Sequence, residues 1–162
     1  MPRLWRLYDH TQPWARAAGF NPLDGSGGLF ATGRWNQLGT RMVYAAASAS
    51  LVALEVLVHV PASLFGERTL VQIEVPDVTP EQVSSQTLLA LLRDARDQDR
   101  EEGTRRYGST WAAEGRSLLL QVPSMVIPHE SNVLINPVHP DAPAVRVIRA
   151  ERFRLDRRLT QP

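Results

Sequence analysis

The sequence predicts a single-domain α+β fold, and three observations support this prediction. The chain has 162 residues, a length that suits one domain with one sizeable core. Strand-like and helix-like segments follow one another without the regular alternation of a βαβ protein. No internal repeat occurs and nothing marks a domain boundary, so residues 1–162 are expected to form one unit.

Two strands separated by a long loop are expected in the first third of the chain. The segment "RLWRLY" predicts a short strand over residues 3–8, and "RMVYAA" predicts another over residues 41–46. Residues 9–33 between them are rich in Gly, Pro and Asn and include an irregular "DGSGG". Ordered loops of this length are often functional.

A helix is expected directly after the second strand. Ser48 or Ser50 can cap its first turn through a side-chain oxygen. Pro61 cannot continue a helix, so the predicted helix runs to about Val60.

The middle of the chain predicts a strand, a turn and a helix. Residues 69–75, "TLVQIEV", alternate apolar and polar side chains as a half-buried strand does, and residues 76–82, "PDVTPEQ", are typical of a turn. Leucines at helical spacing predict a helix over residues 86–98. The polar residues 96–106, "RDQDREEGTRR", are expected to be mobile.

The last third predicts a short helix and then strands. Trp111 and Ala112 indicate the helix, and prolines separate strand candidates at residues 117–124, 132–135 and 144–155. Arginines in the last segment alternate with apolar residues and are interrupted by acidic ones, which favours the solvated face of an edge strand over a nucleic-acid site.

Composition excludes several classes of site. The chain has no cysteine, which rules out disulfides, thiolate zinc sites and a cysteine nucleophile. The net charge is +1, so no general attraction to nucleic acid is expected. All 18 basic residues are arginine, so any phosphate site must use guanidinium groups.

Hydropathy indicates a soluble cytoplasmic protein without a membrane segment. The first residues contain no apolar stretch of signal-peptide length. The longest uncharged apolar run, residues 42–54, is shorter than the ~20 residues that a bilayer requires.

Glu55 is the first candidate functional residue. On a helix it shares a stripe with Leu51, Leu54 and Val58, so its carboxylate is expected on an apolar face. A buried carboxylate needs a cation, a hydrogen-bond donor or a cleft. The alternative is an exposed glutamate at the helix edge, paired with His59.

The motif "GRWN" is the second candidate. Glycine permits a tight backbone that brings Arg34 out beside the planar Trp35, and Asn36 supplies both a donor and an acceptor. This set suits an anionic ligand that contains a ring. A turn with a packed indole and a solvated arginine is equally compatible with the motif.

The third candidate is Ser124 in "VPSMVIPHE". Pro123 and Pro128 are expected to confine a strand with Ser124 near its start, where a hydroxyl can project from the end of a sheet. Taken alone, the serine is more typical of a cap or turn. His129 and His139 lack the spacing of metal ligands, so no metal is expected.

Together these segments resemble the RES family, bacterial toxins named for an arginine, a glutamate and a serine. The motifs "WRL", "GRWNQLGTRMVYAA", "LEVLVH" and "VPSMVIPHESNVLINPVHPD" follow the family's order and cover nearly the whole chain. The resemblance assigns the named residues to Arg34, Glu55 and Ser124, and it implies that Arg6 and Tyr44 line the pocket.

The resemblance implies a fold similar to mono-ADP-ribosyltransferases, with mixed or antiparallel sheets and flanking helices. It also implies NAD+ as substrate, NAD+ breakdown as the toxic act, and a cognate Xre-like helix-turn-helix antitoxin that forms an oligomer with the toxin. Transferases usually carry the catalytic glutamate late in the chain, whereas Glu55 precedes Ser124 here. This order favours nicotinamide release over transfer to a protein.

The residue types fit that chemistry. Cleavage of the nicotinamide–ribose bond passes through an oxocarbenium-like centre that a carboxylate such as Glu55 can stabilise. Arg34 and Arg6 can hold the pyrophosphate, Tyr44 can stack on a ring, and Ser124 can bond ribose or carboxamide. Two alternatives stay open: ADP-ribosylation of a protein, and an interaction module without catalysis.

Overall fold

One seven-stranded sheet runs through the computed structural model, which describes residues 2–93 and 100–160. Its order is β4-β5-β6-β2-β1-β3-β7, and every pairing is antiparallel except β4 with β5. The strands are β1 Arg3–Tyr8, β2 Val43–Ala46, β3 Arg68–Glu74, β4 Glu81–Gln82, β5 Leu119–Pro123, β6 Ser131–Ile135 and β7 Arg146–Phe153. The α-helices are α1 Ala49–Leu57, α2 Ser85–Arg93, α3 Glu102–Glu114 and α4 Arg157–Thr160. The predicted α+β class with a mixed sheet is confirmed.

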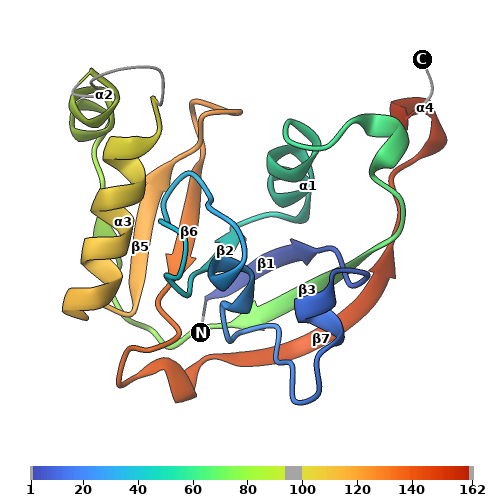
Figure 1. The fold of residues 1–162 in the computed structure, drawn as a ribbon, viewed down its shortest axis with the longest axis horizontal. Coiled ribbons are helices and arrows are strands. Elements are labelled where there is room, and N and C mark those ends of the chain that lie inside the picture. The colour runs from blue at the N-terminus through green and yellow to red at the C-terminus, as the bar shows by residue number, and fades with distance from the viewer. Residues whose placement is uncertain (1, 94–99, 161–162) are drawn as a thin grey trace.

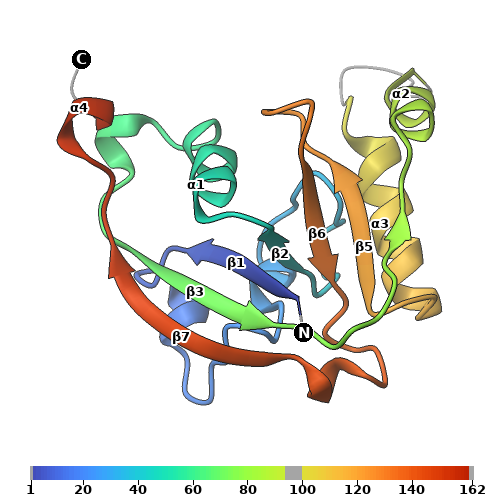
Figure 2. The ribbon, with the colours of Figure 1, turned by 180° about the vertical axis from the view of Figure 1, so that it is seen from behind.

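The sheet consists of two halves with different directions. Strands β3 and β7 sweep across the lower part of the molecule, whereas β5 and β6 stand nearly upright beside α2 and α3 (Figures 1 and 2). The halves join where β1 meets β2, through the register pair Trp5 and Ala46. Beyond that pair β1 continues along β3 to Tyr8, so β1 and β2 diverge. Helix α1 lies over this junction (Figure 1).

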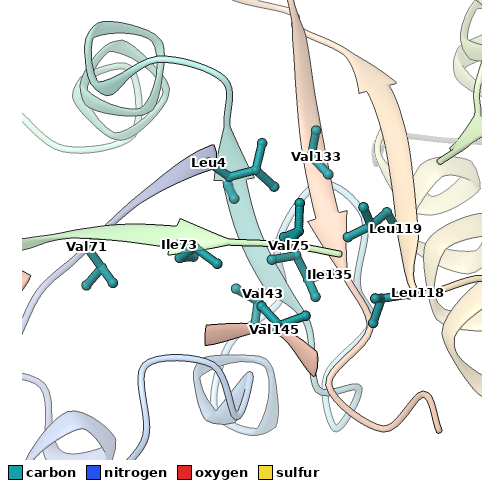
Figure 3. Packing of buried hydrophobic residues seen from close by; sticks show 11 residues of the cluster. Leu4, Val43, Val71, Ile73, Val75, Leu118, Leu119, Val133, Ile135 and Val145 are labelled. Carbon is teal, nitrogen blue, oxygen red and sulfur yellow. The ribbon is translucent and has the colours of Figure 1, made fainter. Parts of the chain in front are cut away.

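Buried side chains pack on both faces of the sheet. One face carries aliphatic residues from both halves of the sheet (Figure 3). Leu23 of the 9–33 loop packs against them. The other face carries two clusters, one under α1 that includes Leu51 and Val52, and one under α2 and α3 that includes Trp111. Burial on both faces is the main stabilising contribution to the fold.

The 9–33 loop is more ordered than its composition suggests. It contains two short 3-10 helices, Pro13–Arg16 and Ser26–Leu29, the second within the segment expected to be irregular. Trp14 and Phe20 pack against the ring of Tyr8, with ring centroids 6.2 and 5.4 Å away. These aromatic contacts hold the loop on the sheet.

Most predicted strands are confirmed with small shifts of their ends. The strand at 3–8 is as predicted, and β7 lies at the edge of the sheet with a largely exposed surface, as expected for the arginine-rich segment. Ser48 is the cap of α1, since its Oγ accepts from the N–H of Leu51 at 3.1 Å. The helix ends at Leu57 rather than Val60, because the N–H of His59 bonds to Val56 in a tighter turn.

The prediction for residues 96–106 is wrong where the structure describes them. Glu102 begins α3, a 13-residue helix that also contains Trp111 and Ala112, so the short helix predicted there is confirmed as part of a longer one. Thr104 is fully buried, and Gly103 lets α3 approach so closely that a Cβ there would lie 2.4 Å from the carbonyl oxygen of Leu91. Packing against α2 therefore outweighs the local polarity. Residues 94–99, including the expected end of the preceding helix, lie outside the described residues.

Two further predictions need correction. Residues 76–82 include β4, which pairs with β5 beside the turn. No strand lies between Pro123 and Pro128: β5 ends at Pro123, and a turn leads to β6. The turn forms because Ser124 accepts backbone hydrogen bonds from Val126 and Ile127. Within residues 2–93 and 100–160, no helix is long and apolar enough to cross a membrane.

Gly108 determines how closely α3 packs on the "GRWN" segment. A Cβ at this position would lie 1.9 Å from the carbonyl oxygen of Trp35. We therefore expect Gly108→Ala to destabilise the protein by about 2–3 kcal/mol, although alanine favours a helix by about 1 kcal/mol. Urea unfolding measures the change, with Ala113→Gly in the same helix as the control for propensity alone. An unchanged or raised midpoint for Gly108→Ala would contradict the steric account.

Candidate active site

A cavity of about 280 Å³ lies under α1, where β1 and β2 diverge. Its walls come from α1, β1, β2, β6 and the end of β5. Apolar side chains form most of the wall, among them Leu7, Val52, Val56 and Leu134. Three groups of polar side chains reach or support it, and each contains at least one of the residues predicted from the sequence.

The first group is built on Glu55, which is half-buried on α1 and lines the cavity. Its Oε1 accepts a 2.7 Å hydrogen bond from the Ser124 hydroxyl and a 2.6 Å hydrogen bond from Nδ2 of Asn132. Both donors use the same oxygen. Within the described residues, Oε2 has no hydrogen-bond partner, so this oxygen is available to a ligand.

The predicted apolar stripe of α1 is not a buried face. Leu51 is buried, but Leu54 is 38% and Val58 59% exposed. The helix contacts the core with Leu51 and its two successors instead. The prediction that Glu55 needs donors or a cleft is confirmed, since it has both.

Ser124 lies just past the end of β5, with its hydroxyl fully engaged. The oxygen accepts from the N–H groups of Val126 and Ile127 at 3.1 and 2.9 Å while it donates to Glu55. The side chain is buried. This geometry suits a residue that fixes the direction of the Glu55 carboxylate better than one that contacts ribose or carboxamide.

The second group is built on Arg34, which lines the cavity from the loop before β2. Its Nη2 lies 3.2 Å from Oε1 of Glu101, at the start of α3. Oε2 of the same carboxylate lies 2.8 Å from Nη2 of Arg105. Arg34 presents its guanidinium at the cavity, which suits an anionic ligand.

The third group links Tyr44 to the loop. The Tyr44 hydroxyl donates to Oδ1 of Asn36 at 2.7 Å and accepts from the N–H of Trp35 at 3.0 Å. Burial raises the pKa of this phenol well above its ordinary value, so it stays a neutral donor. A Cβ on Gly33 would lie 2.4 Å from the Tyr44 oxygen, which explains the glycine before Arg34.

Trp35 and Asn36 support the site from beneath. Both are buried, and the Trp35 ring packs edge-on against Tyr107. The Asn36 amide donates to the carbonyl groups of Ala31 and Gln37, so its hydrogen-bonding groups are used within the loop. Trp35 borders the cavity, and Asn36 does not.

Arg6 does not line the cavity, which corrects the expectation from its motif. Side chains alternate along β1, and Leu7 faces the cavity, so Arg6 points to the opposite face. Burial lowers the pKa of Arg6 to about 10. Its guanidinium carbon lies 5.7 Å from the Tyr8 ring centroid. Arg6 therefore belongs to the packing beneath the 9–33 loop.

Three residues of the site escaped the sequence analysis: Asn132, Glu101 and Arg105. Asn132 is the second residue of β6, after Ser131, and it faces the same side as Leu134 by the alternation of the strand. The i, i+4 spacing of Glu101 and Arg105 was a signal for an ion pair on a helix. Among the described residues, no cluster of His, Asp or Glu could hold a metal ion.

Comparison with known proteins gives consistent results. The family model described as "RES domain" matches residues 3–156. A protein of Sphingobium sp. strain YBL2 named "Prs ADP-ribosylating toxin" is 38% identical over 159 residues, 96% of this chain and 95% of that protein. A Pseudomonas putida protein named "Toxin Res" is 40% identical over 147 residues, 89% of this chain and 97% of its own.

A solved structure supports the fold. The Mycobacterium tuberculosis MbcT-MbcA toxin-antitoxin complex contains a chain that superposes with a TM-score of 0.68 at 16% identity. The match covers 94% of this chain and 84% of that one. At this identity the similarity concerns the fold.

The Tyr44 hydroxyl is expected to stabilise the loop that carries Arg34. Tyr44→Phe leaves the Trp35 N–H and the side-chain oxygen Oδ1 of Asn36 without this partner in a buried setting. We expect a loss of about 2–3 kcal/mol in the free energy of unfolding, measured with denaturant. Tyr107→Phe, which removes a long 3.4 Å contact with Glu81, is the control and should change stability by about 0.5 kcal/mol or less. Equal losses in the two variants would contradict the network.

Proposed function

We propose that this chain, which belongs to the RES domain family, is the toxin of a toxin–antitoxin pair and cleaves the nicotinamide–ribose bond of NAD+. The observation that carries the proposal is the Glu55 carboxylate, held on one oxygen by Ser124 and Asn132 in a cavity that Arg34 also borders. The names of the relatives support a toxin. The name of the Sphingobium relative supports NAD+ as substrate, since ADP-ribosylation takes ADP-ribose from NAD+.

Glu55 would act on the charge that develops at the ribose. As the C1′–N bond breaks, its electron pair leaves with nicotinamide and positive charge grows at C1′ and the ring oxygen. Oε2 of Glu55 would stabilise that charge, because Oε1 is already occupied by two donors. Nicotinamide leaves as a neutral base and needs no general acid.

The acceptor then completes the reaction at C1′. With water, a C1′–O bond forms and one proton is released, giving ADP-ribose and nicotinamide. With phosphate, the oxygen of the acceptor forms the bond instead and ADP-ribose 1″-phosphate results. Glu55 would orient either acceptor through the same oxygen that stabilised the cation.

Arg34 would bind the pyrophosphate. Its guanidinium lies at the cavity, and the pair of arginines around Glu101 keeps a positive charge there. Guanidinium groups bind phosphate through two parallel hydrogen bonds. The apolar walls formed by Val52, Val56 and Leu134 would take the nicotinamide ring and exclude water from it.

ADP-ribosylation of a protein is the second candidate function. The observation that favours it is the 38% identity to a relative named for that activity. Both reactions share the bond cleavage and differ only in the acceptor. Incubation with NAD+ labelled in the adenylate separates them, because only transfer leaves label on a protein.

The partner would be an Xre-like helix-turn-helix antitoxin that covers the cavity. Apolar side chains exposed on α1 and beside Ser124 offer a surface for such contact, among them Leu54, Val58 and Met125. The 9–33 loop, whose Gly33 lines the cavity, and the described part of the 98–106 segment, whose Glu101 contacts Arg34, are the other surfaces that the antitoxin would bury. Hydrogen exchange in the complex would identify which of these surfaces becomes protected.

Release of nicotinamide tests the proposed function. Purified protein incubated with NAD+ should produce free nicotinamide, and expression without an antitoxin should lower cellular NAD+ and stop growth. Glu55→Gln serves as the inactive control in both assays. Growth arrest at an unchanged NAD+ level would count against the proposal.

Kinetics should separate the roles of Arg34 and Glu55. Arg34→Ala should mainly raise KM, since a phosphate contact stabilises ground and transition states alike. Glu55→Gln keeps the shape but removes the charge, so it should lower kcat by on the order of a hundredfold or more. Both proteins should remain folded. A folded Glu55→Gln enzyme with near-normal kcat would make Glu55 structural.

A further inference from the structure

We propose that Glu101 is a positioning residue for Arg34 and that Arg105 helps Glu101 to hold Arg34 in place. This inference rests on the proposed function, because it specifies how the cavity binds the anionic part of its substrate. Three contacts carry this inference: Glu101 to Arg34 at 3.2 Å, Glu101 to Arg105 at 2.8 Å, and Arg105 Nε to the carbonyl oxygen of Gly33 at 3.1 Å.

These contacts close a ring. Glu101 holds the tip of the Arg34 side chain, and Arg105 holds the backbone one residue before it. Arg105 also ties the two contacts together through the second oxygen of Glu101. Both ends of Arg34 are thereby fixed to the start of α3.

The start of α3 is a firm support. The carbonyl oxygen of Glu101 accepts from the N–H of Arg105 and from the hydroxyl of Thr104, both at 2.9 Å. Thr104 and Trp111 are fully buried, and Gly108 brings the helix into contact with the Trp35 backbone. Glu101 is thus presented by an element that the core holds in place.

Arg34 needs such support. Its backbone lies in residues 30–42, between the 3-10 helix Ser26–Leu29 and β2, where the strand-like pairing is limited to the isolated bridge between Gly33 and Asn36. The side chain is 24% exposed, and a free arginine samples many rotamers. An ion pair that selects one direction reduces the entropy lost on binding phosphate. Within the described residues, Glu101 is the one ion-pair partner of Arg34.

The next residue supplies a matched control. Glu102 and Arg106 form the same i, i+4 pair at 3.2 Å on the same helix. Their side chains are 46% and 68% exposed, and neither borders the cavity. Loss of this pair removes a similar helix contact without touching Arg34.

The test compares Glu101→Ala and Glu101→Gln with Glu102→Gln, alone and in the Arg34→Ala background. Steady-state kinetics with NAD+ gives KM and kcat, and calorimetry with ADP-ribose gives an affinity that does not depend on turnover. Glu101→Ala should raise KM and weaken ADP-ribose binding by about threefold to tenfold with kcat nearly unchanged. Glu101→Gln should show a smaller change in the same direction, and Glu102→Gln none.

The double variant identifies the route of the effect. If Glu101 acts through Arg34, Glu101→Ala should add nothing to Arg34→Ala in KM or in ADP-ribose affinity. The inference is overturned if Glu101→Ala weakens ADP-ribose binding as much in the Arg34→Ala background as it does alone. It is also overturned if Glu101→Ala and Glu101→Gln both show wild-type KM and ADP-ribose affinity. Wild-type protein that binds ADP-ribose but releases no nicotinamide would reject the proposed reaction alone, because the calorimetric comparison still measures the Glu101 effect. Protein that does neither would overturn both.

Discussion

The rest of the site depends on the need to satisfy one carboxylate in an apolar wall. A half-buried glutamate without donors would cost several kcal/mol, and α1 offers it none of its own. The donors come from Ser124 at the end of β5 and Asn132 on β6, 69 and 77 residues further along the chain. Both donors bind Oε1. These two hydrogen bonds offset the cost of burying the carboxylate, and they also fix the direction of its other oxygen, Oε2. The cavity is the space left between the helix so held and the diverging strands β1 and β2.

The loop that carries Arg34 is held by a second set of polar contacts. Tyr44 and Asn36 fix its backbone from below, and α3 approaches through Gly108 and holds the side chain with Glu101. The two sets act on different residues but share the sheet: Tyr44 on β2 is the register partner of Leu134 on β6, two residues from Asn132. The relative position of the carboxylate and the guanidinium is therefore set by strands that pair directly.

Patterns in the local sequence predicted several strands and one helix cap. Alternation and chain breakers gave β1, β3 and β7 within a few residues, and the cap at Ser48 follows from its position before an apolar helix. The second half of α3 was predicted from Trp111 and Ala112, but its first half was missed because Thr104 is buried in the core, which a polar local sequence does not reveal. Asn132 was missed for a related reason. Its role depends on the position of α1, which brings Glu55 to its side chain and which the strand sequence does not indicate. Arg6 shows the converse, since its motif indicated the pocket but strand alternation directs it to the other face.

In this fold, the order of the strands in the sheet matters more for the site than the order of the residues along the chain. Glu55 precedes Ser124, the reverse of the arrangement usual in transferases, yet the structure brings the two side chains to 2.7 Å. Their encounter follows from the sheet, because β6 lies between β2 and β5 and is antiparallel to both. The carboxyl ends of β2 and β5, which lead to α1 and to Ser124, therefore lie at the same edge. In the proposed reaction, the acceptor is therefore selected by which molecule reaches Oε2 of Glu55 in the cavity, and not by the order of the two residues along the chain.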